Sequence, residues 1–425
     1  MSVAYYAENE HGLGEKTVFH ALGEAIAPYG TVKKALILPP DMTRGNSYAG
    51  PITCRLYEML GQDCQVDILP ALGTHMPMSE GEIGAMYPGI PAQRFIVHKW
   101  REDVVKIGEV PAAFVREVSE GLMDEAIDVE VNKHLLDPSY DLIVSVGQVV
   151  PHEVVGMANY SKNIFVGCGG FSMLNKTHFL GALYGMERMM GRDDTPVRRV
   201  LDYAQGLLTD IPLLYVLTVT SRQKDVTCLD GLFIGTDRQP FEKAVALSQQ
   251  KNLVFLDQPL KKVVCYLEPE EFKTTWVGNK AIYRTRMAIA DNGELIVIAP
   301  GVHRFGEDMD NDALIRKYGY FGRDQTLAWV RDRACSDLGE NLSVAAHLIH
   351  GSSDGRFRIS YAPGHLSQAE VENAGFAYLP LEQALEKYDI GKLRDGLNTV
   401  DGEEIFYVSN PALGLWAHRE RFFQQ

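Results

Sequence analysis

The sequence is poor in cysteine and has no long apolar run, and both absences narrow the class of protein. Its six cysteines, in 425 residues, are scattered without a C-x-x-C pair or a zinc-like spacing. This is typical of reduced thiols in a cytosol. No window of roughly 18 apolar residues offers a membrane span, and the start, MSVAYYAENEHGLGEK, lacks the features of a signal peptide. We expect a cytoplasmic protein with no membrane contact.

Basic runs and several common catalytic motifs are also missing. The formal net charge is -15, and no run of Lys and Arg is long enough to follow a nucleic-acid backbone. We therefore expect no nucleic-acid partner. There is no G-x-S-x-G, no P-loop, no dinucleotide-binding fingerprint and no H-E-x-x-H pair. A serine hydrolase, a P-loop NTPase and a conventional metal centre are thus not indicated.

Short β-rich runs that end in polar loops are the main feature of the first half of the chain. KKALILPP leads into DMTRGNSYAG, QVDILPAL into GTHMPMSEGEI, and YDLIVSVGQVV into PHEVVG. Apolar runs of this length, alternating with helical stretches, indicate buried parallel strands of an α/β sheet. Ligands of such sheets gather beyond the carboxyl ends of the strands, so these loops are the expected place of a site.

The length favours two domains rather than one core. We predict two α/β domains with mainly parallel sheets flanked by helices, at 1–258 and 259–425, and an active site in the cleft between them. The last ~20 residues are expected to pack back on the first domain. Three local signals add detail: a capping box of Ser79 and Glu82 predicts a helix just after His75, NKTHFLGALYGMERMMG predicts a helix ending near Gly191, and Asp291-Asn292-Gly293 predicts a hairpin turn.

Ionisable side chains gather in four loops of the first half of the chain, and each side chain has an ordinary alternative role. Arg44 could pair with a surface carboxylate, His75 could cap the following helix, and Lys162 could be a solvated amine. Two of the loop histidines nevertheless follow strand-like runs, where groups with near-neutral pKa values serve acid-base chemistry. The full set of candidates is Asp41, Thr43, Arg44, His75, His152, Lys162 and His178.

The order and spacing of this set resemble one known family. D-x-T-R is followed about thirty residues later by G-x-H, then by V-P-H, by a lysine ten residues after that histidine and by a histidine sixteen residues after the lysine. This pattern resembles the lactate racemase family, whose members use a nickel-pincer nucleotide. The resemblance covers about residues 35 to 181.

The resemblance implies how the cofactor is held. In that family a pyridinium-derived mononucleotide carries two sulfur-containing arms, one of them tethered to a lysine as a thioamide. A ring carbon, both sulfurs and one histidine bind the nickel. Lys162 matches the tethering lysine and His178 matches the nickel ligand. Since the cofactor supplies three of four donors, a conventional cluster of protein ligands is not needed, and soft sulfur donors suit nickel. The resemblance also implies cofactor-synthesis enzymes as partners.

The resemblance further implies roles for the loop residues. Hydride leaves the substrate α-carbon for the cofactor and returns to either face, and inversion requires a base on each side of the substrate. His75 and His152 match that pair. Arg44 would bind the substrate carboxylate bidentately. Asp41 and Thr43 would lie at the cofactor, with Thr43 as a phosphate contact.

Two stretches depart from the family pattern. Many members have a glycine-rich run before the tethering lysine, whereas this chain has MANYSK, with the bulky Tyr160. Lactate-acting members also carry a glutamine and a lysine near the substrate on a later helix. Glu242 and Val245 occupy the matching positions here, and Lys243 is displaced by two. The carboxylate side of the pocket is therefore expected to differ from that of a lactate enzyme.

These departures guide the choice of substrate. His303 and Arg304, in PGVHRFGED, are candidates to bind a longer polyhydroxylated acid, with an ordinary polar loop as the alternative. We predict a racemase or epimerase acting at C2 of a 2-hydroxy acid, with an aldonic or other sugar acid favoured over lactate. The alternatives are a racemase of small 2-hydroxy acids and a non-catalytic homologue that only binds the cofactor. Both histidines of the base pair are present, which favours an enzyme.

Overall fold

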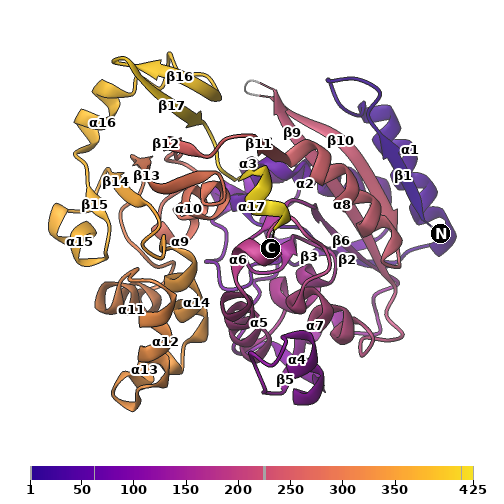
Figure 1. Ribbon diagram of the computed structural model, residues 1–425. Helices are drawn as coiled ribbons and strands as arrows, with labels where there is room; N and C mark the ends of the chain where they lie inside the picture. Colours follow the sequence, from indigo (N-terminus) through magenta and orange to yellow (C-terminus); the bar gives the residue numbers. More distant parts are fainter. Residues whose placement is uncertain (1, 62, 224–225, 413, 425) are drawn as a thin grey trace. The chain divides into compact units, whose positions relative to one another are not determined.

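The computed structural model describes residues 2–61, 63–223, 226–412 and 414–424, and the chain forms two compact units (Figure 1). Unit 1 comprises Met1–Leu180 with Met189–Asn252, and unit 2 comprises Gly181–Arg188 with Leu253–Gln425. Each unit has its own six-stranded sheet with mainly parallel strands and flanking helices, which confirms the predicted α/β class. The domain boundary after residue 258, the packing of the C-terminal end and the cleft site stay predictions.

The sheet of unit 1 brings the three predicted strands together. They are neighbours in the sheet and run parallel, and the last of them is buried along its whole length because it lies inside the sheet. Their carboxyl ends therefore lie at one edge, where polar loops can meet. The order of the sheet is β1 (Val3–Tyr6), β10 (Val226–Gly235), β9 (Leu213–Gln223), β6 (Leu142–Gln148), β2 (Lys34–Leu38) and β3 (Gln65–Ile68).

Helices and a small ribbon complete unit 1. The predicted capping box is confirmed: Ser79 Oγ accepts a hydrogen bond from Glu82 N at 3.3 Å, and Glu82 Oε2 accepts one from Ser79 N at 2.8 Å. His75 therefore lies on the loop before that helix. The elements are α1 (Glu15–Ile26), α2 (Ala49–Leu60), α3 (Glu80–Met86), α4 (Ala112–Val118), α7 (Pro196–Gln205), α8 (Gln239–Asn252) and the strands β4 (Val104–Val110) and β5 (Ile127–Asn132).

The helix that carries His178 differs from the prediction. Helix α5 (Phe171–Tyr184) begins earlier than expected and ends before Gly185, and a separate short helix α6 (Met186–Met189) follows. The predicted single helix to Gly191 is wrong because Gly185 has a φ of +102°, which a right-handed helix does not contain. His178 consequently lies in the middle of α5 rather than in its first turns.

Unit 2 has a second sheet in which one local prediction fails. Residues 289–299 form one strand that pairs in parallel with both neighbours, so the predicted hairpin at Asp291-Asn292-Gly293 is wrong. Asn292, with a φ of +62°, forms an irregularity in the ladder instead, because the turn signal is overridden by pairing on both sides. The sheet order is β15 (Ala377–Tyr378), β14 (Arg358–Pro363), β13 (Ile289–Ala299), β12 (Leu260–Tyr266), β17 (Glu403–Val408) and β16 (Gly396–Val400).

The remaining elements of unit 2 are mostly helical. A two-stranded parallel pair joins β11 (Leu253–Leu256) and β18 (Leu415–His418). The helices are α9 (Thr275–Gly278), α10 (Lys280–Thr285), α11 (Met309–Tyr318), α12 (Arg323–Arg331), α13 (Ser336–Gly339), α14 (Leu342–His350), α15 (Gln368–Asn373), α16 (Leu381–Lys387) and α17 (Arg419–Phe423).

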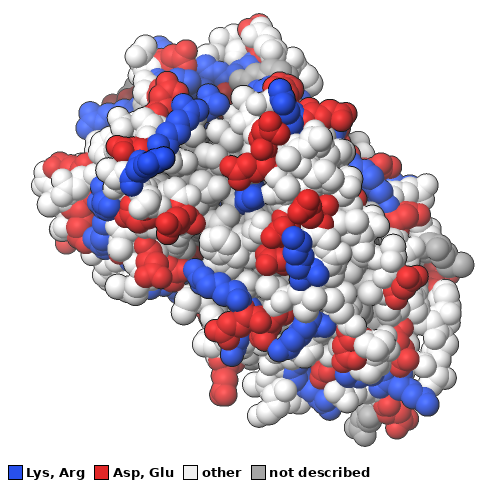
Figure 2. All heavy atoms as spheres, turned by 90° about the horizontal axis from the view of Figure 1, so that it is seen from below, with Lys and Arg blue, Asp and Glu red and all other residues white. Residues whose placement is uncertain are grey.

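The hydrophobicity of the helices and the charge of one face can also be described. None of the helices in the described ranges has both the length and the hydrophobicity that a membrane crossing requires. On the face of the molecule shown in Figure 2, acidic and basic side chains are interspersed.

Candidate functional site

The loop after β2 is held rigidly by Asp41. The residue caps a short 3-10 helix, Met42–Ser47: its Oδ1 accepts hydrogen bonds from the backbone N of Thr43 at 3.0 Å and from the Thr43 hydroxyl at 2.5 Å. The backbone N of Arg44 donates to Asp41 O at 3.0 Å. These contacts place the carboxylate, the hydroxyl and the guanidinium stem of the D-x-T-R motif on one tight turn.

Asp41 and His75 form a hydrogen-bonded pair. Asp41 Oδ2 lies 2.6 Å from His75 Nδ1, and the Asp41 side chain is buried while that of His75 is 31% exposed. Because a carboxylate only accepts, Nδ1 carries the proton, and Nε2 of the neutral ring carries a lone pair. Burial raises the pKa of Asp41, but His75, Thr43 and Arg44 together outweigh it and the pKa falls to about 2. Asp41 is therefore a permanent anion that orients His75.

His152 has the opposite tautomer. It follows β6 in a tight hairpin of β7 (Pro151–His152) and β8 (Gly156–Met157), and its Nδ1 accepts the backbone N–H of Val154 at 3.1 Å. The neutral ring therefore carries its proton on Nε2, which lies 3.8 Å from Glu153 Oε1. Gly156 closes the hairpin with a φ of +88°, and a Cβ there would lie 2.1 Å from the Arg192 carbonyl oxygen. Only glycine fits.

The backbone before Lys162 explains one departure from the family pattern. Asn159 and Tyr160 both have left-handed conformations, with φ of 66° and 57°. A glycine-rich run adopts such angles without strain, whereas each non-glycine residue costs about 1 kcal/mol or more. Tyr160 offsets part of this cost by burial, since its ring centroid lies 4.5 Å from that of Tyr215 and 5.2 Å from that of Phe241. Packing of the Tyr160 ring thus stabilises this turn in the absence of glycine.

Arg198 of α7 holds the same turn. Its Nη2 donates to Met157 O at 2.6 Å and to Asn159 O at 3.2 Å, while Nη1 donates to Ser161 Oγ at 2.8 Å. The guanidinium is fully buried and lies 4.5 Å from the centroid of the Phe241 ring. A planar fork with several donors can bridge backbone groups that a lysine could not. Arg198 therefore fixes the chain directly in front of Lys162.

The amine of Lys162 lies in an environment that disfavours its protonated form. Burial, and then the positive charges of Arg44 and Arg198, lower its pKa from 10.5 to about 8, against opposing effects of Glu153 and Asp41. An appreciable fraction of this lysine is therefore a neutral amine near pH 7, which is the nucleophilic form.

His178 is suited to bind a metal through one nitrogen. Its Nδ1 lies 2.6 Å from the Leu174 carbonyl oxygen, one turn back on α5. A carbonyl only accepts, so Nδ1 donates and Nε2 carries the lone pair. Burial, followed by the charge of Lys162, lowers the pKa of His178 to about 4, which keeps the ring neutral at physiological pH. The described part of the chain gathers no group of three His, Cys, Asp or Glu side chains as a metal site. A single histidine fits a metal whose other donors come from a cofactor.

The electrostatic effects show which candidates lie close together in unit 1. His75, Lys162 and Glu153 all influence the pKa of His178, and Asp41 and Arg44 influence that of Lys162. Glu153 and Arg198 were not predicted from the sequence. Glu153 could have been noticed beside His152, but Arg198 gives no local signal because its contacts are long-range.

The candidates from the later loop belong to unit 2. His303 lies in the segment after β13, where its Nδ1 is 3.2 Å from Gly301 O. Arg304 Nη2 donates to the backbone oxygen of Glu307, within its own loop. The role of both residues in substrate binding stays a prediction.

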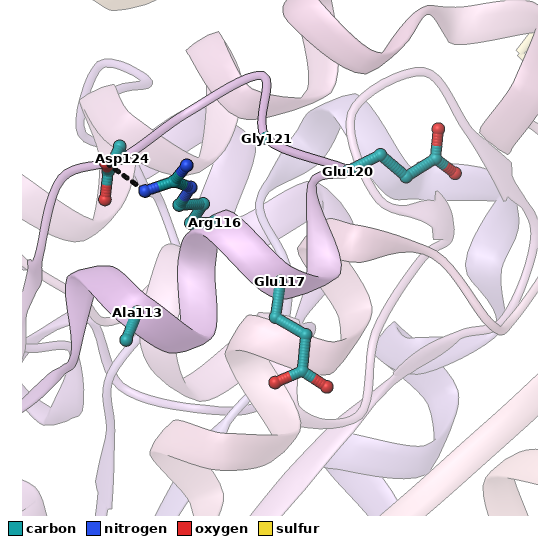
Figure 3. Close-up of a pocket in the computed structure, with 6 residues that line it drawn as sticks. All are labelled: Ala113, Arg116, Glu117, Glu120, Gly121 and Asp124. Carbon is teal, nitrogen blue, oxygen red and sulfur yellow. Dashed lines mark hydrogen bonds and ion pairs between the residues drawn. The ribbon is translucent and has the colours of Figure 1, made fainter.

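A separate hollow in unit 1 contains none of the predicted site residues. It has a volume of about 510 Å³ and lies along α4 and the turn after it (Figure 3). Arg116 forms a 3.4 Å ion pair with Asp124 at its edge. Three of its six lining residues are Asp or Glu, so it does not suit an anionic substrate.

Comparisons with known proteins find a matching domain model and similar solved structures. Residues 24–191 match the model of the lactate racemase N-terminal domain. A crystal structure of a Thermotoga maritima protein aligns with a TM-score of 0.82 at 24% identity, covering 97% of this chain and 100% of that one. The lactate racemase apoprotein from Thermoanaerobacterium thermosaccharolyticum aligns with a TM-score of 0.67 at 16% identity, covering 97% of each chain. No curated protein matches the chain.

Both solved structures have the same fold as this chain. The match to the family model is confined to the N-terminal part. The matched range contains Asp41, His75, His152, Lys162 and His178, so the motif and the domain coincide. Over residues 24–191, the chain is thus similar to the N-terminal domain of lactate racemase.

Proposed function

We propose that the protein is a racemase or epimerase that inverts C2 of a 2-hydroxy acid with a nickel-pincer nucleotide. The family match supports a function of the racemase or epimerase type. The observation that carries the specific proposal is the pairing of two histidines in opposite tautomers with a neutral histidine and a reactive lysine in one unit.

The histidines would handle the hydroxyl proton. His75 Nε2 has the lone pair needed to accept it, and Asp41 would stabilise the imidazolium that forms. His152 starts with a proton on Nε2 and would deliver it when the opposite face is used. When bound, the cofactor supplies a site that takes up the C2 hydrogen as hydride and returns it. Arg44 would bind the carboxylate and orient C2.

The residues present fit the cofactor. The amine of Lys162, with a pKa of about 8, suits covalent attachment to an activated acyl group. His178 Nε2 suits a single metal-ligand bond, because Leu174 holds the other ring nitrogen. Asp41 and Thr43 are proposed to line the cofactor side, although Asp41 also orients His75.

The substrate is proposed to be a sugar acid rather than lactate. The position at which lactate enzymes carry a lysine is Val245, which is buried on α8. Glu242 forms a 3.1 Å ion pair with Arg238. A buried valine cannot bind a carboxylate, so the recognition of the acid must differ. His303 and Arg304 are proposed to supply the hydrogen bonds that a polyhydroxylated chain needs.

The test is to produce the chain together with the cofactor-synthesis enzymes and to measure intact mass, nickel content and racemisation. We expect a nucleotide-sized adduct on Lys162, about one nickel per chain and inversion of an aldonate or another 2-hydroxy acid. His75→Ala and His152→Ala should abolish inversion with nickel retained, and His178→Ala should lose nickel. His20→Ala, an exposed histidine of α1, is the matched control.

Each other outcome has a defined meaning. An adduct without inversion of any 2-hydroxy acid would indicate the cofactor-binding homologue. Full activity on lactate and none on aldonates would indicate the racemase of small acids. No adduct and no nickel, while a control racemase is loaded in the same host, would refute the proposal.

A further inference from the structure

Ser161, the residue directly before Lys162, is fully buried and is held by two side chains of α7. Its Oγ accepts a hydrogen bond from Arg198 Nη1 at 2.8 Å and donates one to Asp202 Oδ1 at 2.9 Å. A guanidinium only donates and a carboxylate only accepts, so the direction of both bonds is fixed. The serine side chain therefore has one orientation, which is set by α7.

The residue after Lys162 is anchored as well. Asn163 Nδ2 donates to Ser145 Oγ of β6 at 2.9 Å and to the Leu38 carbonyl oxygen at the end of β2 at 3.1 Å. Lys162 itself is partly exposed. It thus lies between a neighbour tied to a helix and a neighbour tied to two strands, all within unit 1.

Asp202 is held from its other side by Arg238, which precedes α8. Arg238 Nη1 donates to Asp202 Oδ2, while Nε donates to Glu242 Oε1 at 3.1 Å and Nη2 to Asp193 Oδ2 at 3.3 Å. Each oxygen of Asp202 therefore has its own partner, the Ser161 hydroxyl or the Arg238 guanidinium. This arrangement fixes the carboxylate that orients Ser161.

The charge of Asp202 also bears on Lys162 through Arg198. Burial lowers the pKa of Arg198 to about 10, and the charge of Asp202 opposes that effect. Arg198 is in turn one of the positive charges that lower the pKa of Lys162. The carboxylate thus offsets part of the positive charge near this amine. The other ionisable groups that act on Lys162 or are acted on by it are Asp41, Arg44, Glu153 and His178.

We propose that Ser161 and Asp202 are positioning residues for the amine of Lys162. Ser161 fixes the backbone from which the lysine projects, and Asp202 holds Ser161 and balances the charge of Arg198. That this amine is the point of cofactor attachment rests on the proposed function. Its position and its protonation are properties of the chain alone, and they can be measured without nickel or turnover.

The test is the pH dependence of acetylation of Lys162 by acetic anhydride, in the full chain produced without the cofactor-synthesis enzymes. Peptide mass spectrometry measures the label, with the exposed Lys133 as internal reference. In wild type we expect a midpoint near pH 8. Ser161→Ala removes both hydrogen bonds without changing a charge, so the turn loosens, the amine gains water and the midpoint should rise by about half a pH unit or more. Asp202→Asn removes a negative charge but leaves an oxygen for Ser161, so the midpoint should fall.

The opposite signs separate positioning from a general loss of stability. General loosening would expose the amine to water in both variants and would raise both midpoints. Asp193→Asn is the control, since it removes another carboxylate of Arg238 and leaves both hydrogen bonds of Ser161 in place. It should leave the midpoint unchanged. An unshifted midpoint in Ser161→Ala, or a rise in both Ser161→Ala and Asp202→Asn, would overturn the proposal.

The same variants distinguish this proposal from the proposed function. When the chain is produced with the cofactor-synthesis enzymes, Ser161→Ala should give less adduct on Lys162 than wild type. Opposite shifts of the two midpoints, with no adduct in wild type, would refute the attachment and support the positioning. An adduct in wild type, with no shift in either variant, would refute the positioning alone.

Discussion

Nδ1 of His75 donates a hydrogen bond to Oδ2 of Asp41 across 2.6 Å, and this contact decides which nitrogen of His75 is basic. In the neutral ring, the lone pair is on Nε2 as long as Asp41 is a carboxylate. His152, with Nδ1 bound to the Val154 N–H, has its proton on Nε2 instead. The two proposed bases thus start in complementary states, which is a useful arrangement for inversion.

Replacing Asp41 by asparagine should disable His75 without removing the ring. The amide can donate to Nδ1, which would reverse the tautomer and protonate Nε2. We expect the inversion rate of the loaded enzyme to fall by about 10² to 10⁴-fold, with nickel content unchanged. Asp103→Asn, at a carboxylate paired with Lys133, should have no such effect. Wild-type rates in Asp41→Asn would show that the pair does not orient the base.

In the protein without cofactor, Lys162 should lower the free energy of unfolding. Its folded pKa of about 8 lies below the usual 10.5, so the folded state disfavours the protonated amine. This destabilisation is fully present below about pH 8 and disappears as the pH rises through 10.5. Lys162→Met should therefore raise the free energy of unfolding by about 1 to 3 kcal/mol at pH 7, and the gain should shrink at higher pH. Denaturant unfolding at several pH values measures this.

The control is Lys133→Met, since Lys133 is exposed and paired with Asp103. It should give no gain at pH 7. A gain for Lys162→Met that is the same at pH 7 and pH 10.5 would come from packing rather than from charge, and would contradict the prediction.

The stability of the turn at Asn159 should depend on how easily the residue at this position adopts a positive φ. With a φ of 66°, Asn159→Gly should be tolerated within about 1 kcal/mol. Asn159→Val should destabilise by about 2 kcal/mol or more, because a β-branched residue fits this region poorly. The yield of adduct on Lys162 should follow the same order. Equal stability and equal adduct yield in the two variants would show that the left-handed conformation does not matter there.

Nickel binding through His178 should tolerate moderate acid. A free imidazole has a pKa near 6.5 and is therefore half protonated at about pH 6.5. The pKa of His178 is lower, at about 4. The ring is therefore neutral down to about pH 5 and becomes protonated as the pH falls through 4, so nickel should be lost only in that lower range. Nickel content after equilibration between pH 3.5 and 7 tests this. Loss centred near pH 6.5 would contradict it.

The sequence by itself determined the elements whose signals are local. The strands β2, β3 and β6 were predicted from their apolar runs, and α3 from its capping box, because burial pattern and capping depend on neighbouring residues. The motif residues and their spacing likewise pointed to the lactate racemase N-terminal domain, whose model matches residues 24–191. Where several signals competed, prediction failed: the positive φ of Gly185 breaks the helix after α5, and pairing on both sides of β13 overrides the turn signal at Asn292.

Only the tertiary structure decided the chemical state of the site. Which nitrogen of each histidine carries the proton depends on Asp41, on the Val154 N–H and on the Leu174 carbonyl. The lowered pKa of Lys162 depends on its burial and on Arg44. The same holds for the hydrogen bonds of Arg198, which contacts Met157 across 41 positions of sequence. Tautomers, pKa values and left-handed turns are properties of packed neighbours, and the chain brings those neighbours together only when it folds.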